Sequence, residues 1–241
     1  MLKIKKAKQS KIKNFIWFVF IKLKFIYKKN IIVKYKQINK QNIWAEKLTK
    51  KNFLNTPCLF LDRDGVLIDW KNSLMKINEA KIIKGCEKII KECNKKEIPV
   101  ILITNQGGVG LGLHTWKDFF LTQKKLLNLL LKKNAKIDGV IACAHHPYAK
   151  GRFQHQNHPC RKPNGGMFLI AKKLFNLDLE NSWMIGDKIN DLKAAFSKGL
   201  KGGFLVMTGY GKEEEEKLSQ VPRKNFIVKI ASSINKVKII F

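Results

Sequence analysis

Short apolar runs alternate with longer amphipathic stretches from about residue 57 onward. Runs rich in β-branched residues predict strands, and apolar residues at helical spacing predict helices. Strands are expected at 58–61, 99–103, 139–142, 182–185 and 203–206, and helices near 86–95, 115–132, 167–175 and 190–197. This alternation predicts an α/β fold, a doubly wound parallel sheet with helices on both faces. In such sheets ligands bind beyond the carboxyl ends of the strands.

The N-terminal part of the chain differs from the rest. Residues 1–50 contain 15 lysines, no arginine and one acidic residue, Glu46, which gives this part a net charge of +14. We predict a Lys-rich extension at 1–52, to which no chemistry is assigned, and a single domain at 53–241. The apolar run at 15–21 is short and is followed by lysines, so a secretory signal is not expected, although binding to an anionic membrane surface stays an alternative.

The charge of the whole chain suggests nucleic acid, but the composition argues against it. The 241 residues carry 48 basic and 18 acidic side chains, for a net charge of +30. Only four of the basic residues are arginine, and isoleucine and asparagine are abundant, as AT-rich coding produces. We therefore do not expect a nucleic-acid partner. Five cysteines without a regular framework favour the cytoplasm, and no run reaches the ~18 apolar residues of a transmembrane span.

Acidic side chains directly follow the first predicted strand. Asp62 could act as a nucleophile and help to hold a divalent ion, and Asp64 could exchange a proton with a leaving oxygen. The alternative is a turn in which these aspartates bond the backbone before Gly65.

Two further strands end in groups suited to phosphate and metal. Thr104, Asn105 and Gln106 precede a glycine-rich turn that could hold phosphate oxygens, and its glycines do not have the dinucleotide-binding spacing. The strand at 182–185 leads to Asp187 and Asp191, which add one or two carboxylates at the same edge. Asp62 and Asp187 together could hold Mg²⁺, whereas a helix N-cap is the alternative for Asp187.

These motifs, taken in order, resemble a known superfamily. Asp62-Arg63-Asp64-Gly65, Thr104-Asn105-Gln106, Lys162 and Gly186-Asp187-Lys188 are similar to the four motifs of the haloacid dehalogenase-like phosphatases. The resemblance implies a phosphorylated aspartate at Asp62, a general acid and base at Asp64, and phosphoryl contacts from Thr104 and Lys162. It implies Mg²⁺ at Asp62, Asp64 and Asp187, and a HAD-like Rossmannoid fold without a large cap.

Cysteine and histidine gather between the third and fourth strands. Cys143, His145, His158 and Cys160 supply four sulfur and nitrogen donors, enough to close a tetrahedral Zn²⁺ site in this loop. Such a zinc would be structural and would fix the segment that carries Lys162. His146 or His155 could replace one donor, and scattered loop histidines without metal are the alternative.

The same loop indicates which family of this superfamily the chain resembles. Cys143-Ala144-His145-His146-Pro147, with Cys160-Arg161-Lys162-Pro163, looks like the D-glycero-D-manno-heptose 1,7-bisphosphate 7-phosphatase family and is similar also to the histidinol-phosphate phosphatase domain. The resemblance covers about residues 57–210. It implies substrate contacts from Arg63, Asn105, Gln106, Arg161 and Lys188.

Four departures from that family concern groups around the substrate and the zinc. Leu111 and Met207 stand where the family usually has arginine, and His158 stands where it usually has cysteine. Residues 70–73 replace a frequent Gly-Tyr. Because arginine binds phosphate in a bidentate manner that lysine replaces only in part, these changes bear on the sugar that is recognised.

The resemblance therefore implies a Mg²⁺-dependent phosphatase that removes the 7-phosphate of a heptose bisphosphate used in lipopolysaccharide synthesis, through an aspartyl-phosphate intermediate. We expect a cytoplasmic monomer that acts on a small phosphorylated sugar. Alternatives are a histidinol-phosphate phosphatase or a polynucleotide 3′-phosphatase. A third is a zinc-stabilised binding protein whose Lys-rich arm grips nucleic acid or membrane while the phosphatase site is idle.

Overall fold

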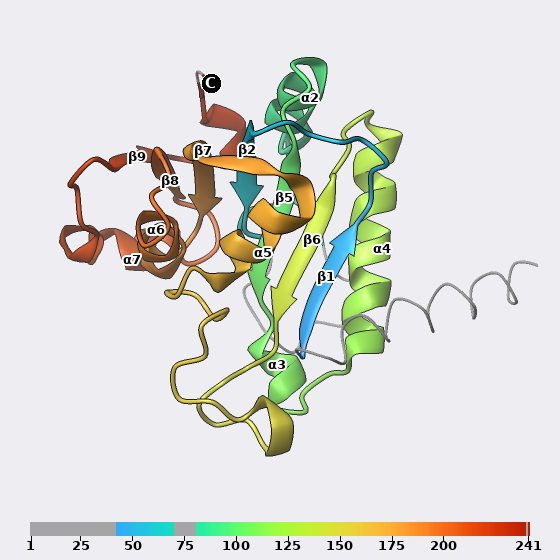
Figure 1. The fold of residues 1–241 in the computed structure, drawn as a ribbon, viewed down its shortest axis with the longest axis vertical. Helices are drawn as coiled ribbons and strands as arrows, with labels where there is room; N and C mark the ends of the chain where they lie inside the picture. The colour runs from blue at the N-terminus through green and yellow to red at the C-terminus, as the bar shows by residue number, and fades with distance from the viewer. Residues whose placement is uncertain (1–41, 70–80, 240) are drawn as a thin grey trace, which may run out of the picture. The chain divides into compact units, whose positions relative to one another are not determined.

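The central element is a mostly parallel sheet (Figure 1), seen in a computed structural model that describes residues 42–69, 81–239 and 241. Its strand order is β1-β6-β5-β2-β7-β8-β9. The strands are β1 (Ile43–Lys47), β2 (Thr56–Leu61), β5 (Val100–Asn105), β6 (Gly139–Cys143), β7 (Leu177–Gly186), β8 (Gly202–Val206) and β9 (Ile227–Ala231). Two-residue strands β3 (Ile68–Asp69) and β4 (Lys81–Ile82) pair separately.

All neighbours in the main sheet are parallel except β1, which runs antiparallel to β6 at one edge. Each parallel crossover within the described chain carries a helix or, after β8, short helical turns. The helices are α2 (Glu87–Lys95), α3 (Gly107–Gly110), α4 (Trp116–Lys132), α5 (Gly166–Phe175), α6 (Ile189–Phe196) and α7 (Gly211–Glu215). The doubly wound parallel sheet predicted from the sequence is confirmed.

The helices bury both faces of the sheet. On one face, α5 packs on β5, β6 and β7, and α6 packs on β7 and β8. The rings of Phe60 on β2 and Phe168 on α5 meet edge to face at 4.8 Å. Against β1, helix α4 presents Trp116 and Phe119, whose rings lie 5.6 Å and 5.3 Å from that of Trp44. These aromatic contacts fix the start of α4 beside the end of β5, where the functional side chains lie.

The domain begins earlier than the sequence predicted. Strand β1 lies within the segment 1–52 that was assigned to the extension, yet it pairs along its whole length with β6. Trp44 is buried, and its indole N–H donates to the buried carboxylate of Glu46 at 3.1 Å. Residues 42–52 therefore belong to the domain, and the predicted boundary at 53 is corrected. Residues 1–41 lie outside the described part of the chain, as do residues 70–73.

No cap domain interrupts the described residues between β2 and α2, which carry only β3 and β4 there. Within the described ranges, no helix combines the length and the apolar character needed to cross a membrane.

Candidate functional site

Three neighbouring strands bring the predicted site residues to one edge of the sheet. β5, β2 and β7 lie side by side, and they lead into Asn105 and Gln106, into Asp62, and into Asp187. A pocket of about 400 Å³ opens there. It is lined by Asp62, Arg63, Asp64, Asn105, Gln106, Gly107, Gly108, Leu113, His114, Asp118, Phe119, Thr122, Arg161, Lys162, Lys188, Asn190, Asp191 and Tyr210.

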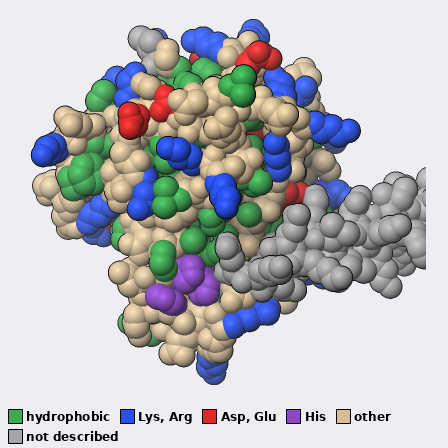
Figure 2. Space-filling view, viewed as in Figure 1, with side chains coloured by type: hydrophobic (Ala, Val, Ile, Leu, Met, Phe, Trp, Pro, Cys, Tyr) green, Lys and Arg blue, Asp and Glu red, His purple; other side chains and the backbone are tan. Residues whose placement is uncertain are grey.

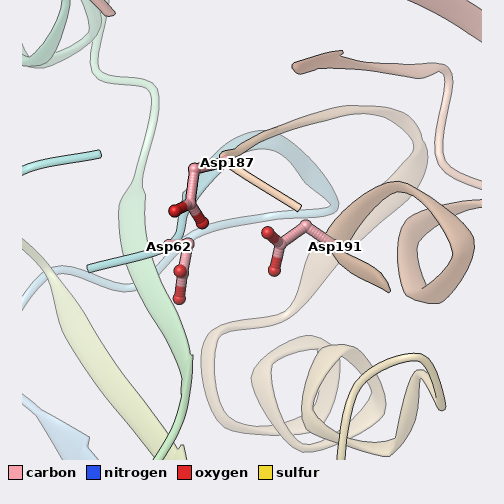
Figure 3. Close-up of side chains that lie close together, drawn as sticks. All are labelled: Asp62, Asp187 and Asp191. Carbon is pink, nitrogen blue, oxygen red and sulfur yellow. The ribbon is translucent and has the colours of Figure 1, made fainter. Parts of the chain in front are cut away.

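Three carboxylates lie close together at this edge of the sheet (Figure 3). Asp62 follows β2, Asp187 follows β7, and Asp191 lies on the first turn of α6. One oxygen from each lies within 4.8 Å of the others, and all three side chains are buried. Oδ2 of Asp187 accepts from the backbone N–H of Tyr210 at 3.0 Å, whereas Oδ1 is buried and has no hydrogen-bond partner among the described residues. A buried carboxylate oxygen without a partner is costly unless a cation meets it.

The clustering shifts the proton affinities of these groups. Burial raises the pKa of Asp62 to about 6, and the charges of Asp191 and Asp64 add to this while Lys162 opposes it. Burial also raises the pKa of Asp187 to about 8, with further contributions from Asp62 and Asp191. Perturbed carboxyl groups at a sheet edge are typical of catalytic and metal-binding sites.

Lys162 supplies the cation inside this group. Its ammonium donates to Oδ1 of Asp62 at 2.8 Å and to the carbonyl of Ile103 at 2.9 Å, and it forms an ion pair with Asp191. Burial alone would lower the pKa of Lys162, but the carboxylates of Asp191 and Asp62 raise it well above its ordinary value. The lysine therefore stays charged beside Asp62.

Asn105 positions the lysine. Its side-chain amide donates to the carbonyl of Lys162 at 3.0 Å and accepts from the N–H of Lys162 at 3.1 Å. This two-way bond joins the end of β5 to the loop before α5, 57 residues later. Asn105 thus fixes the backbone from which the ammonium reaches Asp62.

Asp64 belongs to a second hydrogen-bond network, with Arg63 and Gln106. Arg63 donates to both oxygens of Asp64, at 3.0 and 2.9 Å, and Gln106 donates to it at 2.9 Å. Gln106 also bonds the hydroxyl of Thr104 at 3.0 Å. The guanidinium of Arg63 lies over the ring of Phe119, 5.0 Å from its centre. Asp64 is therefore held in a fixed orientation with a quarter of its side chain exposed to the pocket.

Glycines make the close packing of the carboxylates possible. A Cβ on Gly65, whose φ is +84°, would lie 2.1 Å from Oδ2 of Asp187, and one on Gly186 would lie 2.3 Å from Asp191. Gly65 both provides the left-handed turn and leaves space for Asp187.

Comparison with known proteins identifies the family. Residues 159–232 match a family model described as HAD-hydrolase-like. The chain is 34% identical over 175 residues to a D-glycero-beta-D-manno-heptose-1,7-bisphosphate 7-phosphatase of Mesorhizobium japonicum, covering 70% of this chain and 78% of the relative. It is 38% identical to the enzyme of the same name from Haemophilus ducreyi, covering 63% and 83%. The chain belongs to the D-glycero-beta-D-manno-heptose-1,7-bisphosphate 7-phosphatase family.

A solved structure agrees with this heptose-phosphatase family in fold. The D,D-heptose 1,7-bisphosphate phosphatase from B. bronchiseptica, crystallised with magnesium and phosphate, superposes with a TM-score of 0.64 at 23% identity, over 75% of this chain and 95% of that one. The fold is accordingly HAD-like, and the chain is a phosphatase, a phosphoric monoester hydrolase.

The metal-ligand prediction for this member of the 7-phosphatase family is partly matched by the geometry. Asp62 and Asp187 lie together as expected, but the side chain of Asp64 bonds Arg63 and Gln106 and is not in the carboxylate cluster. Asp191 is the third carboxylate of the cluster, where it forms an ion pair with Lys162. Its spacing after Gly186 is the signal for it, because the glycine at the end of β7 leaves the space that the Asp191 side chain occupies.

The predicted substrate contacts divide into two groups. Arg63, Gln106, Arg161 and Lys188 line the pocket, where Lys188 lies 4.0 Å above the ring of Tyr210. Asn105 lines it too, although its amide is engaged with Lys162. Thr104 is buried and does not line the pocket, and its hydroxyl accepts a hydrogen bond from Gln106. His114 lines the pocket as well and was not singled out from the sequence.

The four predicted zinc ligands lie in one loop region beside β6. Sγ of Cys143 is 3.9 Å from Nδ1 of His158, and the rings of His145 and His158 stack face to face with centroids 3.6 Å apart. Nδ1 of His158 accepts from the N–H of Cys160 at 3.1 Å. Figure 2 shows histidine side chains gathered low in the view, whereas Lys and Arg are spread over the same face. The side chains of Cys143, His145 and His158 are close neighbours, and Cys160 contacts His158 through its backbone N–H. The three-carboxylate group is the metal-type cluster found among the described residues.

The two alternative zinc ligands differ in position. The ring of His155 lies 5.0 Å from that of His158, within the histidine group. His146 turns away: its Nδ1 accepts from the N–H of Tyr148 at 3.2 Å, and its ring lies beside Gly107. His155 is therefore the better placed of the two to replace a predicted donor.

Proposed function

We propose that this chain is a Mg²⁺-dependent phosphatase that removes the 7-phosphate of D-glycero-D-manno-heptose 1,7-bisphosphate through an aspartyl-phosphate on Asp62. The observation that carries the proposal is the buried Asp62, held by Lys162 beside the unpartnered oxygen of Asp187, in a chain of this family. Such a sugar is a precursor in the synthesis of lipopolysaccharide, as the sequence resemblance implies.

Magnesium fits the carboxylate cluster. Mg²⁺ prefers a few carboxylate oxygens together with oxygens of a phosphorylated substrate, and Asp62 and Asp187 offer such oxygens at a buried position. The magnesium in the B. bronchiseptica structure supports this choice of metal. When bound, the ion would neutralise charge on the transferring phosphoryl group. Asp191 is bonded to Lys162 and to the N–H of Lys188 at 3.1 Å, so we assign it the role of holding the lysine.

The side chains support a two-step transfer. In the first step an oxygen of Asp62 forms a bond to phosphorus, and the bond from phosphorus to the sugar oxygen breaks as Asp64 gives that oxygen a proton. In the second step Asp64 takes a proton from water, the water oxygen bonds to phosphorus, and the bond to Asp62 breaks. Lys162 stabilises the charge of the phosphoryl oxygens in both steps.

The pocket suits a small, strongly anionic sugar. Its volume of about 400 Å³ is at the small end for ligand sites. The cationic side chains of Arg161 and Lys188 line it beside Lys162 and favour a substrate with phosphate groups. Leu111 and Met207, which replace arginines usual in the family, do not line the pocket.

The test follows both phosphates of the substrate. Phosphorus NMR of heptose 1,7-bisphosphate with the protein and Mg²⁺ should show loss of the 7-phosphate signal while the 1-phosphate signal stays. Asp62→Asn lacks the nucleophile but keeps the shape of the side chain, so both phosphate signals should stay unchanged with this variant. Release of the 1-phosphate, or turnover that persists in the variant, would contradict the proposal.

A structural zinc ion at Cys143, His145, His158 and Cys160 is the second part of the proposal. Two thiols and two imidazoles form a donor set suited to Zn²⁺, and the closeness of Cys143 to His158 supports it. Purified protein should contain about one zinc per chain, and His158→Ala should lower the content while His146→Ala, at the ring that turns away, should not. Equal zinc in both variants and in the wild type would exclude His158 as a ligand. A cytoplasmic location and a monomeric state remain predictions.

A further inference from the structure

His114 lies on the wall of the pocket, between α3 and α4. Its ring packs directly on the backbone of Gly108, since a Cβ there would lie 2.3 Å from Cε1 and 2.8 Å from Nδ1 of the histidine. The backbone N–H of His114 donates to the carbonyl of Gly108 at 3.4 Å. The glycine therefore leaves the space that the imidazole occupies.

The start of α4 holds this histidine in place. Thr115 caps the helix: its hydroxyl accepts from the N–H of Asp118 at 3.2 Å, and its N–H donates to the carboxylate of Asp118 at 2.8 Å. This reciprocal capping box fixes the backbone that follows His114. The ring is thus held between a fixed helix start and Gly108.

The imidazole is free to bind a ligand. No hydrogen bond to either ring nitrogen occurs within the part of the chain that the structure describes. The charged side chains that act on it are Arg63, Asp118 and Asp64. Burial, followed by the charge of Arg63, lowers its pKa below the ordinary value, so at neutral pH the ring offers one donor and one acceptor.

The position of His114 relative to Asp64 indicates which part of a substrate it meets. Phosphorus must lie beside Asp62, whereas Asp64 must reach the oxygen that joins phosphorus to the sugar. Arg63 bonds both oxygens of Asp64, and its guanidinium lies over the ring of Phe119 on the first turns of α4, the helix whose cap directly follows His114. His114, Arg63 and Asp64 also line the same pocket. The leaving alcohol therefore extends past Asp64 toward the imidazole.

We propose that His114 is a specificity-determining residue that hydrogen-bonds a hydroxyl group of the sugar alcohol, not the transferring phosphoryl group. This inference rests on the proposed phosphatase function and names a further part of its substrate recognition. A neutral hydrogen bond made in the ground state and the transition state alike changes binding and leaves the chemical step unchanged.

The test compares two esters that differ in their leaving alcohol. Heptose 1,7-bisphosphate has sugar hydroxyls, and p-nitrophenyl phosphate has none. His114→Phe, which keeps a flat ring, should raise KM for the bisphosphate by about 3- to 10-fold with kcat within about twofold. Kinetics with p-nitrophenyl phosphate should not change. His114→Gln, which keeps a donor and an acceptor, should retain most of the affinity, and Lys117→Ala on an exposed position of α4 is the control.

Two results would overturn the inference while the proposed function stands: an unchanged KM for the bisphosphate in His114→Phe, or equal losses with both esters. His114→Ala provides the same comparison if the phenylalanine variant does not fold. A wild-type protein that cleaves p-nitrophenyl phosphate but not the bisphosphate would instead contradict the proposed function, and the inference would fall with it.

Discussion

Replacing Asp187 by asparagine should make the metal-free protein more stable, and increasingly so as the pH rises. Asp187 is 1% exposed, and burial, then Asp62 and Asp191, raise its pKa from 3.8 to about 8. Because the folded pKa lies above the unfolded one, the folded state binds the extra proton. The wild-type protein therefore loses stability from this group as the pH rises from about 4 to about 8.

The size of the effect follows from the two pKa values. At pH 7 the unfolded carboxyl is ionised and the folded one is mostly protonated. Between the unfolded pKa of 3.8 and pH 7, this lowers the free energy of unfolding by about 4 kcal/mol, at 1.36 kcal/mol per pH unit. Asparagine is neutral in both states and keeps an oxygen for the N–H of Tyr210. We expect Asp187→Asn to recover about half of this loss, about 2 kcal/mol in the free energy of unfolding, since the new amide must still be desolvated. That corresponds to about 4 to 8 °C in Tm for a domain of this size.

Thermal unfolding in EDTA at pH 5 and pH 8 measures this directly. The gain of Asp187→Asn should be clearly larger at pH 8, whereas Asp69→Asn, at an exposed carboxyl, should change Tm at neither pH. Adding Mg²⁺ at pH 8 should raise Tm of the wild type and not of Asp187→Asn, because binding to the folded state stabilises it by mass action. A variant that is less stable than the wild type, or a gain that is the same at both pH values, would refute the reasoning.

Two further substitutions test the packing around the carboxylates. Lys162→Met should abolish phosphate release and cost about 3–5 kcal/mol in urea unfolding, because it leaves two buried carboxylates without their cation. A stability equal to that of Lys173→Met, at an exposed lysine, would contradict this. Gly65→Ala should abolish the Mg²⁺-dependent rise in Tm, since its Cβ would lie 2.1 Å from Asp187. Gly112→Ala has a similar positive φ with nothing within 4 Å, so it controls for backbone strain alone, and loss of the Mg²⁺ effect there would remove the explanation.

The interior of the fold was predictable because its strands contain continuous apolar runs, as at 100–103 and 139–142. The edge strands were not. β1 contains Glu46 and Lys47 and follows a Lys-rich segment, so its composition resembles that of a charged extension. Its pairing with β6, the bond from Trp44 to Glu46 and the cover provided by α4 hold this strand in the sheet, and these contacts form only in the folded chain. β9 leaves Ile227 and Ile230 about half exposed, a pattern that carries little periodic signal.

The site was predictable as far as each residue follows a strand. Asp62, Asn105 and Asp187 are all at strand ends, and parallel strands bring such residues together. What could not be read from the sequence is the direction of each side chain. Asp64 turns to Arg63, and Asp191 turns toward Lys162, because hydrogen bonds formed only in the folded chain orient them.

The most direct test of the proposed function is a comparison of kcat/KM for heptose 1,7-bisphosphate, histidinol phosphate and a 3′-phosphorylated oligonucleotide, each with Mg²⁺ and with Asp62→Asn as the blank. A phosphatase of the proposed specificity should prefer the bisphosphate by at least about 10-fold, equivalent to about 1.4 kcal/mol. Equal or higher kcat/KM for either other ester would contradict it, as would phosphate release from the bisphosphate that survives in the variant.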